Sequence, residues 1–474
     1  MKRVIYFSLS IFVLASCQKN MTSLNINPEA PSVVPSSTLV TQAEFNMAST
    51  ASSSNVNLNI FRLIQQYWTE TTYTDESNYN LATRSIPDNW WNAWYRDVLN
   101  NLQQARVFAR KDITDAGTLA NDTAIIDILQ CYAYFNLVTT FGNIPYSQAL
   151  NPENTFPKYD DAKTVYYDII SRLGKDAAAL NPSAGSWGNA DILYNGSPAA
   201  WAKFAYSLQL KMGALIGDSD PTESKSVMEA AAPHVFASNA DNATFSFQSS
   251  PPYTNPIWVD LVQSGRTDFV ATTTVIGIMT PLNDPRIPNY FTTDANNSYS
   301  GGIPGKGNNY PAFSHAGTAI VAPTFPGDLL DYAETRFYLA EGAARGFNMG
   351  AATAEQNYDS AITASIEFWG GTASDAATYL AQPTVAYTTA TGTWQQKIGT
   401  QLYIALYNRG WDSWTEYRQL NYPTLVAPPT ALSVFPQRFL YPSKEENVNT
   451  ANYNAASAAI GGDKVGTKLW FDKN

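Results

Sequence analysis

Cysteine and histidine are scarce in this sequence, with two residues of each among 474. Two cysteines cannot build a disulfide framework, so stability has to come from the core. His234 and His315 are too few and too isolated for an imidazole metal site, and no Cys or His spacing is typical of zinc. We therefore expect no cofactor and no metal. One alternative stays open, namely calcium held by carboxylate oxygens of Asp75, Glu76 or the segment near Asp284.

Charge is also sparse, since Asp, Glu, Lys and Arg make up 15% of the chain, and the net charge is -11. That balance argues against nucleic acid as a partner. No P-loop, dinucleotide fingerprint or nucleophile elbow is present in a strand-to-helix context. The segment GGIPGKG at 301–307 lacks the GK[ST] ending of a phosphate loop, so we expect a turn-rich loop there. No carboxylate stands in a distinctive local pattern either.

Long apolar runs are missing except at the start of the chain. Lys2 and Arg3 precede an apolar run from Val4 to Leu14, and small residues then lead to Cys17. This order predicts a lipoprotein signal peptide over 1–16, with Cys17 becoming the lipidated first residue that carries fatty acyl chains such as palmitate. The polar, proline-rich stretch 17–37 is predicted to be a tether, and 38–474 a single domain.

Aromatic residues are plentiful, at 13% of the chain. Several stand on polar, non-periodic stretches: Gln65 to Ser85, and a Pro-, Gly- and Asn-rich insertion at about 238–327. Aromatic rings beside Asn, Asp and Thr are what a sugar ring requires, because its C–H face stacks while its hydroxyls form hydrogen bonds. Packing that anchors the loops is the alternative. The predicted ligand-binding residues are Trp68, Tyr73, Tyr79, Trp258, Tyr290 and Tyr299.

Apolar residues recur at helical spacing along most of the chain, which predicts a mostly α-helical fold. The strongest segment is a helix over 122–141, apolar on almost every face, with Asn121 or Asp122 as its cap and Gly142 at its end. Paired helices with small residues at the crossings are typical of a tetratricopeptide-like repeat scaffold. Further helices are expected at about 38–51, 56–68, 87–111, 160–180, 198–216, 222–237, 328–346, 354–369 and 393–408.

Several segments, in order along the chain, resemble the SusD/RagB family of surface lipoproteins. No single segment is decisive, but their joint occurrence is highly specific. They are LNINPEAPS (24–32), QQYWTETTY, WWNAWYRDVLNNL, FGNIPYSQAL, ILYNGSPAAWAKFAYSLQLKM (192–212), YAETRFYLAEGAARG, IALYNRGWDSWTEYRQLNYPTL (404–425) and FPQRFLYPSKEENVNTANY (435–453).

The resemblance implies a helical fold of four tetratricopeptide-like units with an irregular ligand-binding part. It also implies an outer-membrane location facing outward, and a SusC-like TonB-dependent transporter as partner. Members of the family most often bind glycans, whereas the RagB branch is associated with peptides, so both ligand classes stay open. The resemblance implies a binder without catalysis, and the rival is an α/α-barrel glycoside hydrolase or lyase, which needs two carboxylates roughly 5 to 9 Å apart. Arg438 and the segment 441–446 fit the family's C-terminal packing signature.

Overall fold

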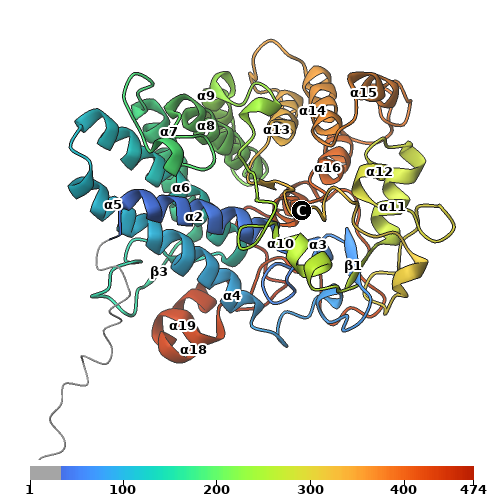
Figure 1. The fold of residues 1–474 in the computed structure, drawn as a ribbon, viewed down its shortest axis with the longest axis horizontal. Helices are drawn as coiled ribbons and strands as arrows, with labels where there is room; N and C mark the ends of the chain where they lie inside the picture. The colour runs from blue at the N-terminus through green and yellow to red at the C-terminus, as the bar shows by residue number, and fades with distance from the viewer. Residues whose placement is uncertain (1–33, 474) are drawn as a thin grey trace, which may run out of the picture. The chain divides into compact units, whose positions relative to one another are not determined.

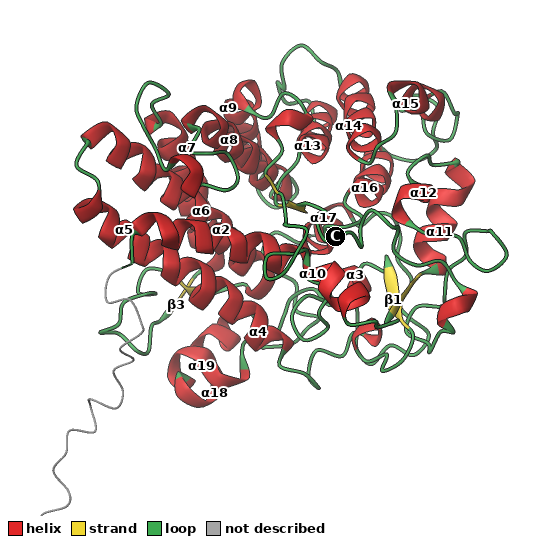
Figure 2. Ribbon diagram, viewed as in Figure 1, coloured by secondary structure: helices red, strands yellow, loops and turns green. Residues whose placement is uncertain are grey.

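The computed structural model describes residues 34–473, so the predicted signal peptide, Cys17 and most of the predicted tether lie outside the described residues. From Ser36 onward the chain forms one unit, built mostly of helices with three two-stranded sheets (Figure 1, Figure 2). The predicted mostly α-helical, tetratricopeptide-like fold is confirmed. The longer helices are α2 (Ser36–Ser52), α5 (Asn100–Asp112), α6 (Ala116–Phe141), α7 (Ala162–Ala179), α8 (Pro198–Leu215), α9 (Pro221–Ala231), α13 (Tyr332–Ala344), α14 (Ala354–Phe368), α16 (Trp394–Ala405) and α17 (Gly410–Leu420).

The central helix is α6, and it starts earlier than the sequence predicts. Asp115 is its N-cap and accepts a hydrogen bond from the Thr118 N–H at 2.8 Å. The prediction that Asn121 or Asp122 caps the helix is wrong, because both are buried inside it. The Asn121 side chain donates to the Asn181 carbonyl at 3.0 Å, and Asp122 accepts from the Ser186 hydroxyl at 3.0 Å. Cap-type residues here serve contacts to a neighbouring loop instead.

Among the described residues, α6 is also the one helix of sufficient length and apolarity to cross a membrane, but 94% of its most apolar window is buried inside the protein. It is therefore the core helix that the sequence predicts. Its C-terminus is at Gly142, as predicted, with a positive φ of 87° that favours glycine. Beyond it, Ile144 and Pro145 form the short extended strand β2.

The remaining long helices pack as neighbours along the chain. α6 packs on α7, α7 on α8, α8 on α9 and α13, and α13 on α14 and α16. The fully buried Ala340 of α13 and Ala361 of α14 are among the small residues predicted at crossings. Most predicted helices are confirmed to within a few residues. The largest departure is at 56–68, where only α3 (Phe61–Ile64) is helical.

The reason for that departure is a strand that pairs with a distant part of the chain. Gln66 has a positive φ of 55°, which ends the helical path. Strand β1 (Trp68–Glu70) then pairs antiparallel with β5 (Phe269–Ala271), with Trp68 opposite Ala271. This ribbon joins the two aromatic stretches found in the sequence. Two smaller ribbons pair β2 (Ile144–Pro145) with β3 (Tyr159–Asp160), and β4 (Thr244–Phe245) with β6 (Gly327–Asp328).

The segment from Pro87 also departs from one regular helix. It forms α4 (Ile86–Asn92), a π-helical turn η3 (Ala93–Leu99), and α5. Trp90 is fully buried and packs its ring edge-to-face on Phe61 of α3 and on Trp94. Neighbouring elements thus cover this helix on more than one face.

The C-terminal segment closes the end of α6. The last carbonyls of a helix have no partner within the helix. Here the Arg418 guanidinium donates to the Thr139 carbonyl at 2.7 Å, the Phe439 N–H to Thr140 at 2.9 Å, and the Arg438 guanidinium to Phe141 at 2.9 and 3.1 Å. Arg438 is fully buried and also pairs with Asp463. The two short helices α18 (Ser443–Val448) and α19 (Thr450–Ala459) follow.

A buried ionic cluster joins α8, α13 and the start of α17. Lys211 lies 3.0 Å from Glu334, and Arg409 lies 2.5 Å from Glu334 and 3.1 Å from Asp412. All four side chains are buried. Glu416 adjoins this cluster through Tyr338, whose hydroxyl donates to Glu334 at 2.8 Å and lies 2.9 Å from an oxygen of Glu416. The helical scaffold is thus held together by charge pairs as well as by apolar packing.

Candidate ligand-binding site

Three of the six predicted ligand-binding residues are buried. Trp68, Tyr79 and Tyr290 are 2%, 1% and 0% exposed. Their polar atoms are engaged inside the protein: the Trp68 indole donates to the Tyr407 hydroxyl at 2.7 Å, and the Tyr290 hydroxyl donates to the Ile404 carbonyl at 2.9 Å. Tyr79 accepts from the Gln66 side chain at 3.0 Å, and burial raises its pKa to about 12. The alternative of loop-anchoring packing therefore describes these three rings.

The other three are accessible to solvent. Tyr73 is 80% exposed, and it lies on the loop after β1. Trp258 is half-buried at the end of the short helix α10 (Pro256–Trp258), which continues as the π-helical turn η7 (Val259–Gln263). Tyr299 is half-buried next to Ser300, whose backbone pairs with that of Ser314. Among the described residues, these three rings make no ring contact with one another, and none of them lines a pocket near β5.

Beside β5 lies a cleft made of two adjoining pockets that share Arg266 and Phe269. We call it the Arg266 cleft. The polar pocket has a volume of about 140 Å³ and the aromatic pocket one of about 200 Å³. All residues of the aromatic pocket fall within the loop-rich insertion at 238–327. The polar pocket is lined by Ser54, Asn55, Val56, Asn57, Arg84, Asp260, Arg266, Asp268 and Phe269; the aromatic one by Leu261, Val262, Arg266, Phe269, Thr292, Tyr310, His315, Ala316, Thr318 and Val321.

The aromatic pocket contains a stacked pair of rings. Tyr310 and His315 lie with centroids 3.7 Å apart and planes within 6° of parallel. His315 Nε2 lies 2.7 Å from the Tyr310 carbonyl, which can only accept, so we assign the proton to Nε2. Nδ1 then accepts from the Thr292 hydroxyl at 3.4 Å. These bonds fix the imidazole ring, and burial raises the pKa of the Tyr310 hydroxyl. The pair forms a flat, preformed surface.

The polar pocket holds both charges and neutral hydrogen-bonding groups. Arg266 pairs with Asp268 at 2.6 Å and keeps a largely exposed side chain. Asp260 accepts from the Ser54 hydroxyl at 2.9 Å, and burial raises the pKa of Asp260. Arg84 donates to the Asn57 side chain at 3.3 Å. The pocket therefore offers donors and acceptors within a small space, next to the ring surface.

The loop that carries Tyr73 is attached to the edge of the polar pocket by a backbone hydrogen bond. The Thr71 N–H donates to the Asp268 carbonyl at 2.8 Å. Glu70 and Glu76 are both buried, and the Ser77 N–H donates to Glu70 at 2.9 Å. Burial, together with a hydrogen bond to Glu76, raises the pKa of Glu70 well above its ordinary range, while Glu76 pairs with Arg84. The two carboxyl groups are sealed from solvent, so they are not a hydrolytic pair open to substrate.

The loop at 301–307 is a turn-rich segment, as predicted. A Cβ at Gly301 would lie 2.1 Å from the Thr272 carbonyl carbon, so glycine is required for this close approach to β5. Asn78 ties the same loop down, since its side chain donates to the Gly305 carbonyl at 2.7 Å.

The acidic residues considered for calcium are occupied by other partners. Asp284 makes a two-pronged pair with Arg286 at 2.9 and 2.6 Å. Asp75 accepts from the Asn80 side chain at 3.2 Å, and Glu76 pairs with Arg84 as described. These carboxylates do not converge on one point.

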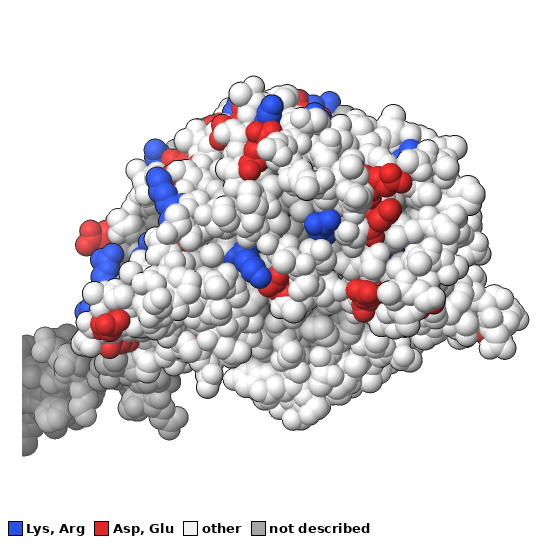
Figure 3. All heavy atoms as spheres, turned by 90° about the horizontal axis from the view of Figure 1, so that it is seen from above, with Lys and Arg blue, Asp and Glu red and all other residues white. Residues whose placement is uncertain are grey.

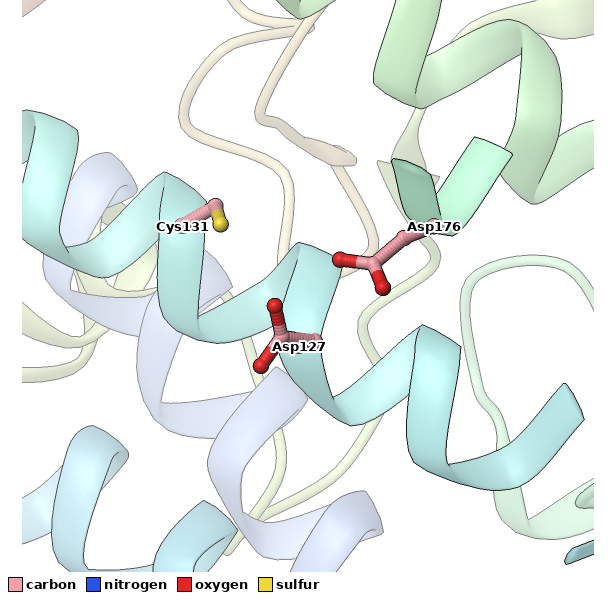
Figure 4. Close-up of side chains that lie close together, drawn as sticks. All are labelled: Asp127, Cys131 and Asp176. Atoms are coloured by element: carbon pink, nitrogen blue, oxygen red, sulfur yellow. The ribbon is translucent and has the colours of Figure 1, made fainter. Parts of the chain in front are cut away.

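One other group, Asp127, Cys131 and Asp176, brings potential metal ligands within 4.8 Å of one another (Figure 4). Arg172 donates to both oxygens of Asp127 at 2.9 Å, and Arg106 pairs with it too. Burial alone would raise the pKa of Asp127, but these guanidinium groups lower it overall. Burial also raises the pKa of the Cys131 thiol, which keeps its proton. Two arginines and a protonated thiol do not fit a cation site.

Sequence reasoning missed Arg266, Asp268 and the Tyr310–His315 pair as a unit. The tyrosine stands out in sequence only as one aromatic among several, and His315 only as an isolated histidine. Their stacking depends on a short turn, from the 3-10 helix η9 (Tyr310–Ala312) back to β5, that has no periodic pattern. The amino-acid composition did predict the loop-rich insertion at about 238–327 in which these residues lie.

The fold and the cleft define a class: a helical-repeat scaffold that presents an aromatic and polar cleft on irregular loops. Comparison with known protein families makes this class more specific. A SusD-like family described as "starch-binding associating with outer membrane" matches residues 28–442. The chain belongs to this family. A search of curated proteins finds no match.

Solved structures agree with this assignment. A chitin-binding SusD homologue from Flavobacterium johnsoniae is 27% identical, with a TM-score of 0.78 over 92% of this chain and 99% of the other. A SusD homologue from Bacteroides uniformis is 25% identical, with a TM-score of 0.78 over the same shares. Another structure, titled a chitin-binding protein, is 23% identical with a TM-score of 0.79 over 93% of this chain and 100% of its own, and this one speaks for the fold alone.

Proposed function

We propose that the protein captures extracellular oligosaccharides and that the Arg266 cleft is where it holds them. The single observation that carries this proposal is the flat Tyr310–His315 pair next to a pocket of neutral and charged hydrogen-bonding groups. A sugar ring has one apolar C–H face and a rim of hydroxyls, so it needs both features side by side.

The contacts follow from the chemistry of each group. The stacked rings take the C–H face of a sugar, while Arg266 donates to ring or hydroxyl oxygens and Asp260 and Asp268 accept from hydroxyls. Tyr73, Trp258 and Tyr299 do not line the cleft, and we propose them as contacts for further sugar units of a longer ligand. Of the six aromatic residues predicted from sequence, these three are the ones that we retain.

Chitin fragments are the first ligands to test. The Flavobacterium johnsoniae relative, described as chitin-binding, is among the structures with sequence identity above 25%. Charged side chains are scattered over the face seen in Figure 3, with wide uncharged areas between them, which suits a neutral polymer. Peptides are the second candidate ligand, because the sequence resemblance includes the RagB branch.

We further propose that Cys17 carries the lipid anchor on the outer face of the outer membrane, and that a SusC-like TonB-dependent transporter receives the captured ligand. The family description, with its association with the outer membrane, supports the location. The order of charged, apolar and small residues before Cys17 supports the anchor. We propose that the protein has no catalytic activity of its own.

The test is isothermal titration of the full chain with chitin, cellulose and starch oligosaccharides and with peptide digests, followed by mass spectrometry of the recovered ligand. We expect an intact oligosaccharide to bind. Tyr310→Ala should then weaken binding about 2- to 13-fold, since an aromatic contact contributes about 0.5 to 1.5 kcal/mol. Arg266→Met should weaken it by a similar factor.

Matched controls are Phe156→Ala, which removes an exposed ring elsewhere, and Arg96→Met, which removes an exposed arginine. Both should bind as the unmodified chain does. Retention of peptides alone would replace the oligosaccharide proposal with the peptide one. Ligand that is shortened with time would show that the protein is a hydrolase or lyase.

A further inference from the structure

A second cavity, separate from the Arg266 cleft, lies against α16. Its volume is about 510 Å³, within the usual range for small-molecule sites. α16 forms one wall, the loop after α15 (Ala373–Leu380) forms another, and residues 422–424 form a third; α15 and α16 are labelled in Figure 1. It shares no lining residue with the Arg266 cleft.

The lining is rich in neutral hydrogen-bonding groups. Within residues 34–473, the hydroxyls of the four lining threonines and of Tyr422 make no hydrogen bond to protein. Gln396 uses only its side-chain oxygen, which accepts from the Thr393 N–H at 2.8 Å, so its two amide hydrogens stay free. The threonines are Thr384, Thr391, Thr400 and Thr424.

Of the four lining threonines, Thr400 is half-buried and the other three are exposed, so their hydroxyls are open to solvent or ligand, whereas buried threonines such as Thr139 and Thr335 bond internally. The Thr139 hydroxyl donates to the Phe135 carbonyl at 2.7 Å, and the Thr335 hydroxyl to Asp331 at 2.8 Å. Such bonds leave the side chain without capacity for a ligand. The cavity beside α16 therefore gathers unused donors and acceptors in one place.

The one cation of the lining is already engaged. Lys397 donates to the Tyr387 carbonyl at 2.7 Å, and its ammonium lies 5.3 Å from the centre of the Tyr387 ring. No acidic residue lines the cavity. The ammonium keeps further N–H donors that can reach a sugar oxygen, whereas a cationic ligand finds no countercharge in the lining.

The walls are fixed before any ligand arrives. The Tyr358 hydroxyl donates to the Val385 carbonyl at 2.9 Å and holds the loop after α15. Gln401 is held between Arg286 at 3.1 Å and Tyr379 at 2.9 Å. Gly399 lets the 422–424 segment approach α16 closely, since a Cβ there would lie 2.9 Å from that of Tyr422. A preformed site loses little conformational freedom on binding.

From these observations we infer that the cavity beside α16 is a second binding site for a hydroxyl-rich sugar unit. The four threonine hydroxyls, the Tyr422 hydroxyl and the Gln396 amide are its hydrogen-bonding groups. The choice of a sugar as ligand rests on the proposed function, but the existence of a second, separate site does not. Two sites on one chain raise the affinity for a polymer that reaches both, relative to a short fragment that occupies one.

The test counts bound ligands. Native mass spectrometry of the full chain with a three-unit chitin fragment should show up to two fragments per chain. The triple variant Thr391→Val, Thr400→Val and Thr424→Val removes hydroxyls at nearly constant volume, and should bind one fragment with at least a fivefold loss at the second. Thr222→Val, at an exposed position of α9, is the control and should bind two.

A chain with Arg266→Met and Tyr310→Ala separates the two proposals. If the second site exists, this variant still binds one fragment, and the addition of the three valines removes it. If the unmodified chain binds a single fragment and the Arg266 cleft variant binds none, the second site is overturned and the proposed function stands. If no fragment of chitin, cellulose or starch binds to the unmodified chain, both are overturned.

Discussion

Glu416 on α17 is 3% exposed, and the charges of neighbouring carboxyl groups act on its pKa. Burial raises its pKa to about 8, even though the charge of Lys211 acts in the opposite direction. One oxygen lies 2.9 Å from the Tyr338 hydroxyl, whose single hydrogen goes to Glu334, so a protonated Glu416 donates to that hydroxyl, and the other oxygen has no partner. Near neutral pH this side chain therefore keeps its proton inside the folded protein, and the ionic cluster next to it has one negative charge fewer than its composition implies.

This proton predicts a pH dependence of stability. Between the ordinary glutamic pKa of 4.5 and about 8, the folded state holds a proton that the unfolded state has released, so this group lowers the free energy of unfolding as pH rises. Glu416→Gln, which resembles the protonated form, should remove this contribution, at most about 1.4 kcal/mol per pH unit. Urea unfolding at pH 5 and pH 8 measures it.

The exposed Glu153→Gln is the matched control, and its pH dependence should follow that of the unmodified chain. If Glu416→Gln loses as much stability between pH 5 and pH 8 as the unmodified chain, then Glu416 is ionised in the fold.

At the residue scale, sequence composition finds regions better than it finds contacts. Tyr73 and Tyr290 look alike in sequence, since both stand on polar stretches, yet one is exposed and the other stacks on Tyr407 at 4.3 Å. The difference arises from tertiary packing against α16, about which local sequence carries no signal. For the same reason the stacked pair of Tyr310 and His315 could not be predicted.

At the scale of elements, the existence of a helix could be predicted from sequence where apolar residues recur at helical spacing. The residues at which a helix begins and ends were predicted less well. α8 begins at Pro198, as the predicted range 198–216 has it, and Ser197 caps it. α6 begins at Ala116 because Asp115 caps it, whereas the equally suitable Asn121 is used by a loop. β1 could not be predicted, because its partner strand is about two hundred residues away.

The end of α6 gives a prediction for an element. Arg438→Met removes the guanidinium that binds the Phe141 carbonyl and pairs with Asp463, and leaves both groups buried without it. Removing one partner of a buried pair costs about 3 to 5 kcal/mol. We expect a fall of this size in the free energy of unfolding, measured by urea denaturation.

Arg96→Met is the control for the Arg438 variant, because Arg96 pairs with Asp97 at an exposed position. Its effect should stay below about 1 kcal/mol. Equal stability losses in the two variants would mean that the end of α6 does not depend on Arg438.

At the scale of the whole molecule, the protein is acidic while its candidate sites are largely neutral or internally paired. The net charge is -11, yet Arg266 pairs with Asp268 in the Arg266 cleft, and Lys397 is engaged beside α16. Binding of a neutral sugar therefore releases few counterions. Long-range attraction between charges does not contribute to the binding of such a ligand.

Salt then distinguishes the two ligand classes. The affinity for a neutral oligosaccharide should change less than about twofold between roughly 50 and 500 mM salt, because screening acts on charges. Titration calorimetry at both concentrations measures this. A charged peptide with the same binding groups should lose affinity steeply over the same range, and such a loss for the bound ligand would favour the peptide alternative.

The capping of α6 by Arg438 also sets an order of events for a newly made chain. The carbonyl of Phe141 obtains its partner from a residue 297 positions later. While a chain emerges from its N-terminus, this carbonyl has no protein partner until residue 438 has been added. The end of the central helix is therefore completed late in folding. A stop codon anywhere before position 438 should give a product for degradation, not a shorter binder.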